Sequence, residues 1–141
     1  MTGNWHIRRC FARRLDAMPA ILAFLDEALP ANGASAGERH ALEFAIEELF
    51  TNLVKYNAQG SGDIEIELEG DAHQVIGRMC DPDSDRFDIT ATPDADVDLP
   101  AELRQPGGLG LHLLRRMVDH VEYAHDGRRS LVTFRKTRQR G

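Results

Sequence analysis

Apolar residues recur at helical spacing along residues 35–56, the most strongly patterned part of the chain. Ser35, followed three residues later by Glu38, has the form of a capping box and predicts that the helix begins there. Glu48 and Asn52 are four residues apart, so they lie one turn from each other at the rim of the apolar stripe. Two interpretations remain open: a solvated helix edge, or a carboxylate and a carboxamide that face a cavity. The apolar positions are Leu42, Ala45, Ile46, Leu49, Leu53 and Tyr56.

Strict alternation of apolar and acidic residues over 63–70 predicts a half-buried strand with Ile64, Ile66 and Leu68 facing inward. A second strand at 74–80 follows after a short link, which favours an antiparallel hairpin. The other predicted elements are a strand at 6–12, helices at 15–29 and 109–120, and strands at 121–124 and 130–136.

This order of elements predicts an α/β two-layer sandwich, with a mixed, mainly antiparallel sheet and helices packed on one face. Residues 84–106 have no clear period, contain three prolines at 93, 100 and 106, and are expected to form a mobile lid. With 141 residues the chain is expected to be a single domain, 1–141.

The charge pattern limits the function classes. The net charge is −6, and the charged residues after Asp126 are all basic, which is more typical of a solvated strand and terminus than of a nucleic-acid arm. Two distant cysteines, Cys10 and Cys80, favour neither a disulfide framework nor a zinc site. There is no long apolar run and no visible signal peptide. We therefore expect a cytoplasmic protein that binds neither membranes nor nucleic acid directly.

Two further features could carry chemistry. Glycines at Gly107, Gly108 and Gly110 lie immediately before and within the third predicted helix, where backbone N–H groups and the helix dipole favour a phosphate; an ordinary turn is the alternative. Asp81 ends the second middle strand and could accept a hydrogen bond from the exocyclic amine of a base. The alternative for Asp81 is a turn-forming role in Asp81-Pro-Asp83.

Together these segments resemble the N, G1 and G2 boxes of the GHKL (Bergerat) ATP-binding fold, which includes gyrase, Hsp90, histidine kinases and MutL. The resemblance covers nearly the whole chain. Among GHKL proteins, this chain is most similar to the bacterial anti-sigma-factor serine/threonine-protein kinases. The matching segments are Glu48-x-x-x-Asn52, Asp81, Phe87-Asp88, and Gly107-Gly-Leu-Gly-Leu-His-Leu-Leu-Arg-Arg-Met-Val-Asp119.

The resemblance implies ATP and Mg²⁺ as cofactors. Asn52 would bind Mg²⁺ through its side-chain oxygen, and Glu48 would act as general base or orient the attacking hydroxyl. Asp81 would accept from adenine N6. The remaining implied nucleotide contacts are Lys55, Tyr56, Gly107, Gly108, Leu109, Gly110 and Thr133.

Two departures from the family pattern keep alternatives open. Asp83 stands where relatives usually have the glycine of Asp-x-Gly, and Lys55-Tyr56 is more similar to sensor histidine kinases. The leading hypothesis is a regulator that binds Mg-ATP, sequesters a sigma factor and phosphorylates Ser or Thr of a STAS-domain antagonist. The alternatives are a non-catalytic partner-switching module with a degenerate nucleotide site, and a stand-alone histidine-kinase-like ATPase domain. Family members commonly form homodimers, for which residues 6–12 and the helix from Leu15 are candidate surfaces.

Overall fold

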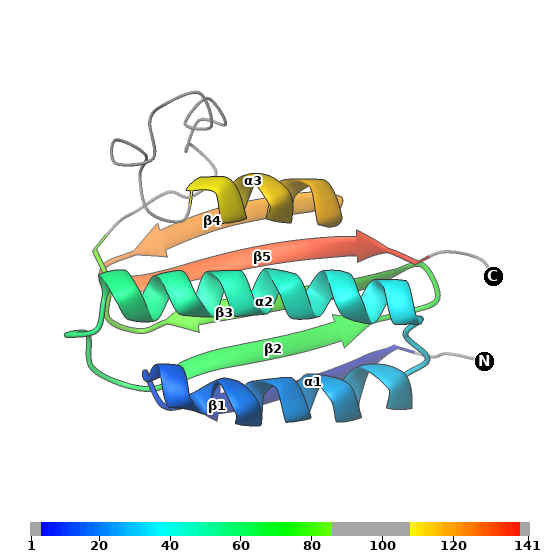
Figure 1. Cartoon of the computed structure of the whole chain (residues 1–141), viewed down its shortest axis with the longest axis horizontal. Helices are drawn as coiled ribbons and strands as arrows, with labels where there is room; N and C mark the ends of the chain where they lie inside the picture. Colours follow the sequence, from blue (N-terminus) through cyan, green and yellow to red (C-terminus); the bar gives the residue numbers. More distant parts are fainter. Residues whose placement is uncertain (1–3, 86–107, 139–141) are drawn as a thin grey trace.

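A five-stranded sheet with helices on one face forms the molecule (Figure 1). The computed structural model describes residues 4–85 and 108–138. The strands lie in the order β1-β2-β3-β5-β4, and each neighbouring pair is antiparallel. This confirms the predicted two-layer sandwich. The elements are β1 (Trp5–Phe11), a 3₁₀ turn (Leu15–Ala17), α1 (Met18–Ala31), α2 (Ala36–Tyr56), β2 (Ile64–Gly70), β3 (Gln74–Asp81), α3 (Gly108–Met117), β4 (His120–Asp126) and β5 (Arg129–Thr137).

Helix α2 begins at the predicted capping box. The Ser35 hydroxyl accepts from the Glu38 amide at 3.1 Å, and the Glu38 carboxylate accepts from the Ser35 amide at 2.9 Å. Glu38 is buried, and Arg138 Nε lies 3.4 Å from its Oε1. Since Arg138 directly follows β5, this ion pair fastens the end of a central strand to the start of the longest helix.

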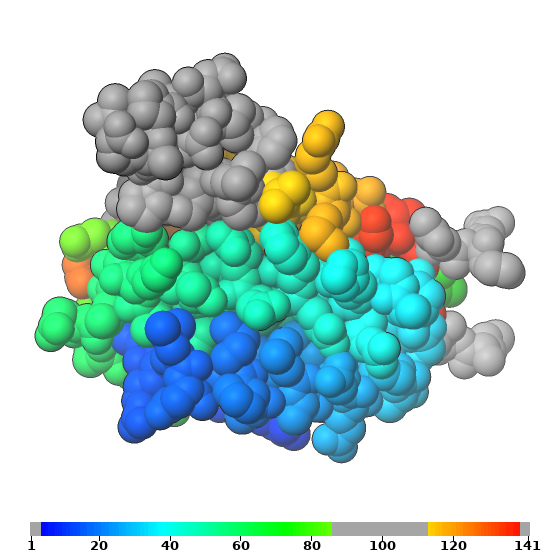
Figure 2. Space-filling model, viewed as in Figure 1, coloured from blue at the N-terminus to red at the C-terminus, as the bar shows by residue number. Residues whose placement is uncertain are grey.

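The core lies between the helices and one face of the sheet. Ile64, Ile66 and Leu68 are fully buried, as the alternation predicts, while the acidic residues between them face the open side. The space-filling view shows α1 and α2 packed side by side on this face (Figure 2), and the cartoon shows the sheet behind them (Figure 1). None of the described helices is long and apolar enough to cross a membrane.

Helix α1 differs from its predicted range of 15–29. A 3₁₀ turn precedes it, Pro19 lies in its first turn, and the helix continues through Pro30 to Ala31. Pro30 lies in the last turn and cannot donate to the Asp26 carbonyl, so the helix loses one backbone hydrogen bond there. Beyond it, the Asn32 side chain donates to the Ala28 carbonyl at 2.8 Å and satisfies one acceptor at the helix end. The chain then turns at Gly33, which has a positive φ of 82°.

A carboxyl pair joins α1 to α2. Glu43 on α2 hydrogen-bonds to Asp26 on α1, and burial followed by this contact raises the pKa of Glu43 to about 7. Arg39 Nε is 4.0 Å from Glu43 Oε1, which is too far for a hydrogen bond. Glu43 therefore holds a proton in the folded state over a pH range in which the unfolded chain releases it.

We expect the stability of the fold to decrease as the pH rises from about 4.5 to about 7, because the folded state binds the extra proton within that window. Glu43→Gln mimics the protonated carboxyl. The variant should match the parent near pH 5 and exceed it by about 1–3 kcal/mol near pH 8 in urea unfolding. Glu27→Gln, at an exposed position on α1 that does not contribute to the shift of Glu43, is the control and should show no such pH dependence. An equal effect of Glu43→Gln at both pH values would contradict the assignment.

Candidate nucleotide site

Most of the predicted site residues that the structure describes lie on elements that meet at one end of the sheet. The C-terminal half of α2, the end of β3 and the start of α3 all lie at this end (Figure 1). On α2 the Asn52 Nδ2 donates to Glu48 Oε1 at 3.1 Å, and both side chains are half-buried. Because the amide nitrogen points at Glu48, the amide oxygen is directed away from it and is the atom that a hard cation would take.

Asp81 lies at the predicted strand end, but its carboxylate is fully engaged within the protein. Arg13 binds it in a bidentate manner, with Nη2 2.7 Å from Oδ1 and Nη1 2.9 Å from Oδ2. Asn57 Nδ2 donates to Oδ2 at 2.8 Å, and the Asp83 amide donates to Oδ1 at 2.9 Å. The side chains of Arg13 and Asp81 are only 5% and 4% exposed. Each carboxylate oxygen thus has two donors, which is its full complement.

The loop that follows α2 closes over this ion pair. Arg13 Nη2 also donates to the Ser61 carbonyl at 3.1 Å, and Asn57 Nδ2 donates to the Asp83 carbonyl at 2.6 Å. Asp83 in turn accepts from the Ser61 amide at 2.7 Å. This backbone hydrogen bond, followed by the contact with Arg128, holds the pKa of Asp83 below its usual range. Asp83, which stands where relatives usually have a glycine, therefore holds the loop after α2 in place through its hydrogen bond with Ser61.

Gly60 provides the space that the guanidinium occupies. A Cβ at Gly60 would lie 2.7 Å from the Asp83 carbonyl oxygen and 2.8 Å from Arg13 Cζ. Gly60→Ala should therefore destabilise the fold by about 1–3 kcal/mol in urea unfolding, because the loop must move away from the ion pair. Gly37→Ala, on the open surface of α2 with nothing within 4 Å, is the matched control and should be neutral or stabilising. Equal effects of the two substitutions would show that the close approach is absent.

The structure does not bring Thr133 to this site, so that prediction is corrected. In the β3–β5 register Thr133 is opposite Arg78, whereas Gly77 is opposite Phe134 in the core. Thr133 therefore lies on the open face of the sheet, away from the helices. The residue opposite Asp81 is Ser130. Its hydroxyl hydrogen-bonds to Ser84 Oγ and lies 3.2 Å from Tyr123 Oη, inside the sandwich at the site end.

The structure describes some of the other predicted nucleotide contacts, whereas the rest lie outside the described residues. Lys55 is exposed, and Tyr56 is 55% exposed, so Tyr56 lies outside the core although it belongs to the apolar series of α2. Gly108, Leu109 and Gly110 form the first turn of α3. Gly107, Phe87, Asp88 and all but the first two residues of the predicted lid lie outside the described residues.

Arg13 and Asn57 are the site residues that sequence reasoning missed. Neither belongs to a periodic pattern, since Arg13 follows the end of β1 and Asn57 caps α2. Both contact Asp81, which lies 68 positions after Arg13 and 24 positions after Asn57. The only local signal was a polar residue at a helix end followed by Gly60, which also fits an ordinary loop.

The phosphate end of the site fits a magnesium nucleotide. Among the described residues no group of three or more His, Cys, Asp or Glu side chains could hold a metal ion by itself. Mg²⁺ in nucleotide sites is held by one or two protein oxygens together with phosphates and waters, and the side-chain oxygen of Asn52 could supply one of the protein ligands. At the base end, by contrast, Asp81 has no free acceptor position.

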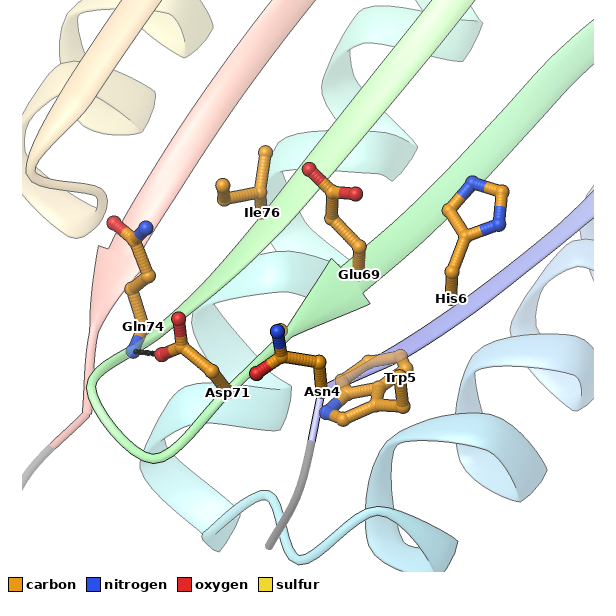
Figure 3. Close-up of a pocket in the computed structure, with 8 residues that line it drawn as sticks. Asn4, Trp5, His6, Glu69, Asp71, Gln74 and Ile76 are labelled. Carbon is orange, nitrogen blue, oxygen red and sulfur yellow. Dashed lines mark hydrogen bonds between the residues drawn. The ribbon is translucent and has the colours of Figure 1, made fainter.

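A separate depression of about 330 Å³ lies far from these residues. It opens beside the link between β2 and β3, at the other end of the sheet (Figure 3). Its acidic groups are already engaged: Glu69 pairs with Arg78 at 2.7 Å, and Asp71 accepts from the amides of His73 and Gln74. It contains none of the predicted site residues.

Comparison with known families identifies the class. The family model for the histidine kinase-like ATPase domain matches residues 11–136. The match covers most of the chain, which therefore belongs to the histidine kinase-like ATPase domain family. No individual curated protein sequence matches it.

Solved structures share the fold at low sequence identity. The RsbU and RsbW domains of Rv1364c from Mycobacterium tuberculosis align over 97% of this chain, with a TM-score of 0.69 and 15% identity. This chain spans about a third (33%) of that protein. The SiaB–SiaC complex from Pseudomonas aeruginosa aligns over 93% of this chain and 89% of the other, with a TM-score of 0.57 and 14% identity. Together with the family match, the shared fold shows that this chain has a GHKL-type ATPase fold.

Proposed function

We propose that this protein is a partner-switching regulator that binds Mg-ATP and transfers phosphate to Ser or Thr of a STAS-domain antagonist, and that it also sequesters a sigma factor. The observation that carries the proposal is the Glu48–Asn52 pair, half-buried on α2 and joined at 3.1 Å, at the end of the sheet where α3 begins. A structural neighbour is described as the SiaB–SiaC complex, so a domain of this fold binds a partner protein.

Each residue has a distinct role in this proposal. Asn52 provides an amide oxygen to Mg²⁺, which neutralises the phosphates and orients them. Glu48 accepts the proton of the attacking hydroxyl, and its hydrogen bond from Asn52 fixes its position relative to the metal. Gly108 and Gly110 lie in the first turn of α3, where free backbone N–H groups favour phosphate oxygens.

Calorimetric titration with Mg-ATP tests binding, and transfer of radiolabelled γ-phosphate to a STAS-domain protein tests catalysis. Glu48→Ala should lower the transfer rate by about 10²–10⁴-fold with little change in nucleotide binding, because general-base catalysis contributes in that range. Asn52→Ala should weaken the Mg²⁺-dependent part of binding. Glu47→Ala, an exposed neighbour, is the control. Unchanged transfer in Glu48→Ala and Asn52→Ala would refute the assigned roles.

A second candidate function is a partner-switching module without catalysis. The engaged carboxylate of Asp81 and the replacement of the family glycine by Asp83 favour it. This function predicts that Asn52→Ala captures the sigma factor and the antagonist as well as the parent does, and that no phosphate is transferred. Co-purification of each partner with and without ATP distinguishes the two functions.

Self-association is also proposed. Strand β1 lies at the edge of the sheet, beside α1, so both candidate surfaces for a homodimer are at the periphery of the molecule (Figure 1).

A further inference from the structure

We infer that Arg13 controls base selectivity: by binding both oxygens of Asp81, it withdraws this carboxylate from recognition of the 6-amino group of adenine. The inference rests on the proposed nucleotide function and concerns the base end of the same site. It predicts a site that holds the nucleotide mainly by its phosphates and its metal, with little preference among purines that differ at position 6.

The hydrogen-bond geometry leaves no acceptor for a base. The Asp81 carboxylate offers about four lone-pair positions. The four donors are Arg13 Nη1 and Nη2, Asn57 Nδ2 and the Asp83 amide, all between 2.7 and 2.9 Å away. A 6-amino group could bind only if one of these donors withdrew.

Arg13 is also the donor that is hardest to displace. Its side chain is 5% exposed, and bidentate guanidinium–carboxylate pairs are among the strongest hydrogen-bonded contacts in proteins. The guanidinium is held from its other side by the Ser61 carbonyl at 3.1 Å, under the loop that Gly60 allows to approach. Leaving this cation unpaired in the interior is unfavourable, which keeps Asp81 occupied.

The test compares the binding of Mg-ATP with that of the Mg²⁺ complex of purine riboside triphosphate, which has hydrogen in place of the 6-amino group. The parent should bind the two within about threefold of each other. In Arg13→Met the freed carboxylate accepts from the 6-amino group, and the preference for ATP should rise at least about tenfold over that of the parent. Arg14→Met, whose ion pair with Asp16 is exposed, is the matched control and should behave like the parent.

Arg13→Lys provides a second variant with a retained positive charge. An ammonium group cannot span both oxygens, so the preference for ATP should rise by an intermediate factor.

The parent protein alone provides the first outcome. If the parent prefers ATP over purine riboside triphosphate by tenfold or more, the inference is overturned, whereas the proposed nucleotide function stands. An unchanged preference in Arg13→Met and Arg13→Lys also overturns it. If neither nucleotide binds the parent or either variant, the proposed nucleotide function fails, and the inference fails with it. Binding of ATP by Arg13→Met but not by the parent also overturns the inference, which predicts that the parent holds the nucleotide by its phosphates and its metal.

Discussion

Replacing Arg13 by methionine is expected to lower the free energy of unfolding by about 3–5 kcal/mol, the range for breaking one half of a buried ion pair. The loss comes mainly from the unpaired charge left on Asp81, whose side chain is 4% exposed. Typical domains have a total stability of about 5–15 kcal/mol, so the variant should remain folded but should unfold at a clearly lower urea concentration.

Two comparisons isolate the cause. Arg14→Met removes the neighbouring arginine, whose side chain is 70% exposed, and should change stability by less than about 0.5 kcal/mol. The double variant Arg13→Met/Asp81→Asn leaves no charge unpaired and should recover part of the loss. If the double variant loses the sum of the single effects, the pair is not coupled and the geometry described above is incorrect.

Replacing Gly77 by alanine is expected to cost about 3 kcal/mol, at the upper end of the usual range for an overpacked core. A Cβ at this position would lie 2.4 Å from Cε2 and Cζ of Phe134, which is fully buried on the neighbouring strand β5. The ring cannot move away, because it is enclosed between the sheet and the helices. Thermal or urea unfolding measures the loss.

A compensating substitution tests this explanation. Phe134→Leu alone should destabilise the fold by leaving a cavity, but in combination with Gly77→Ala it makes room for the new methyl group. The double variant should therefore be more stable than the sum of the two single effects predicts, by about 1 kcal/mol or more. Strict additivity would show that Gly77 and Phe134 do not compete for the same space.

The parts of the fold that sequence reasoning predicted are governed by local rules. The start of α2 depends on Ser35 and Glu38, three residues apart, and both predicted hydrogen bonds are present. The buried face of β2 follows from alternation alone, because successive side chains of a strand point to opposite faces. The Glu48–Asn52 contact follows from helical spacing in the same way.

The parts that it missed depend on how distant segments pair. Thr133 and Ser130 are both hydroxyl residues of β5, and only the register with β3 shows which of them faces the helices beside Asp81. The engagement of Asp81 by Arg13 joins residues 68 positions apart, across elements whose packing no periodicity describes. A strand-end aspartate therefore looks the same in sequence whether it faces a ligand or an internal arginine.

The strand order has a consequence for biosynthesis. Among the described strands, β5 is the last in the sequence, yet it lies between β3 and β4, and β4 is hydrogen-bonded only to β5. A nascent chain that has emerged only as far as β4 can pair β1, β2 and β3, but β4 has no neighbour and the edge of β3 stays open. Completion of the described sheet must therefore wait until residues 129–137 have left the ribosome.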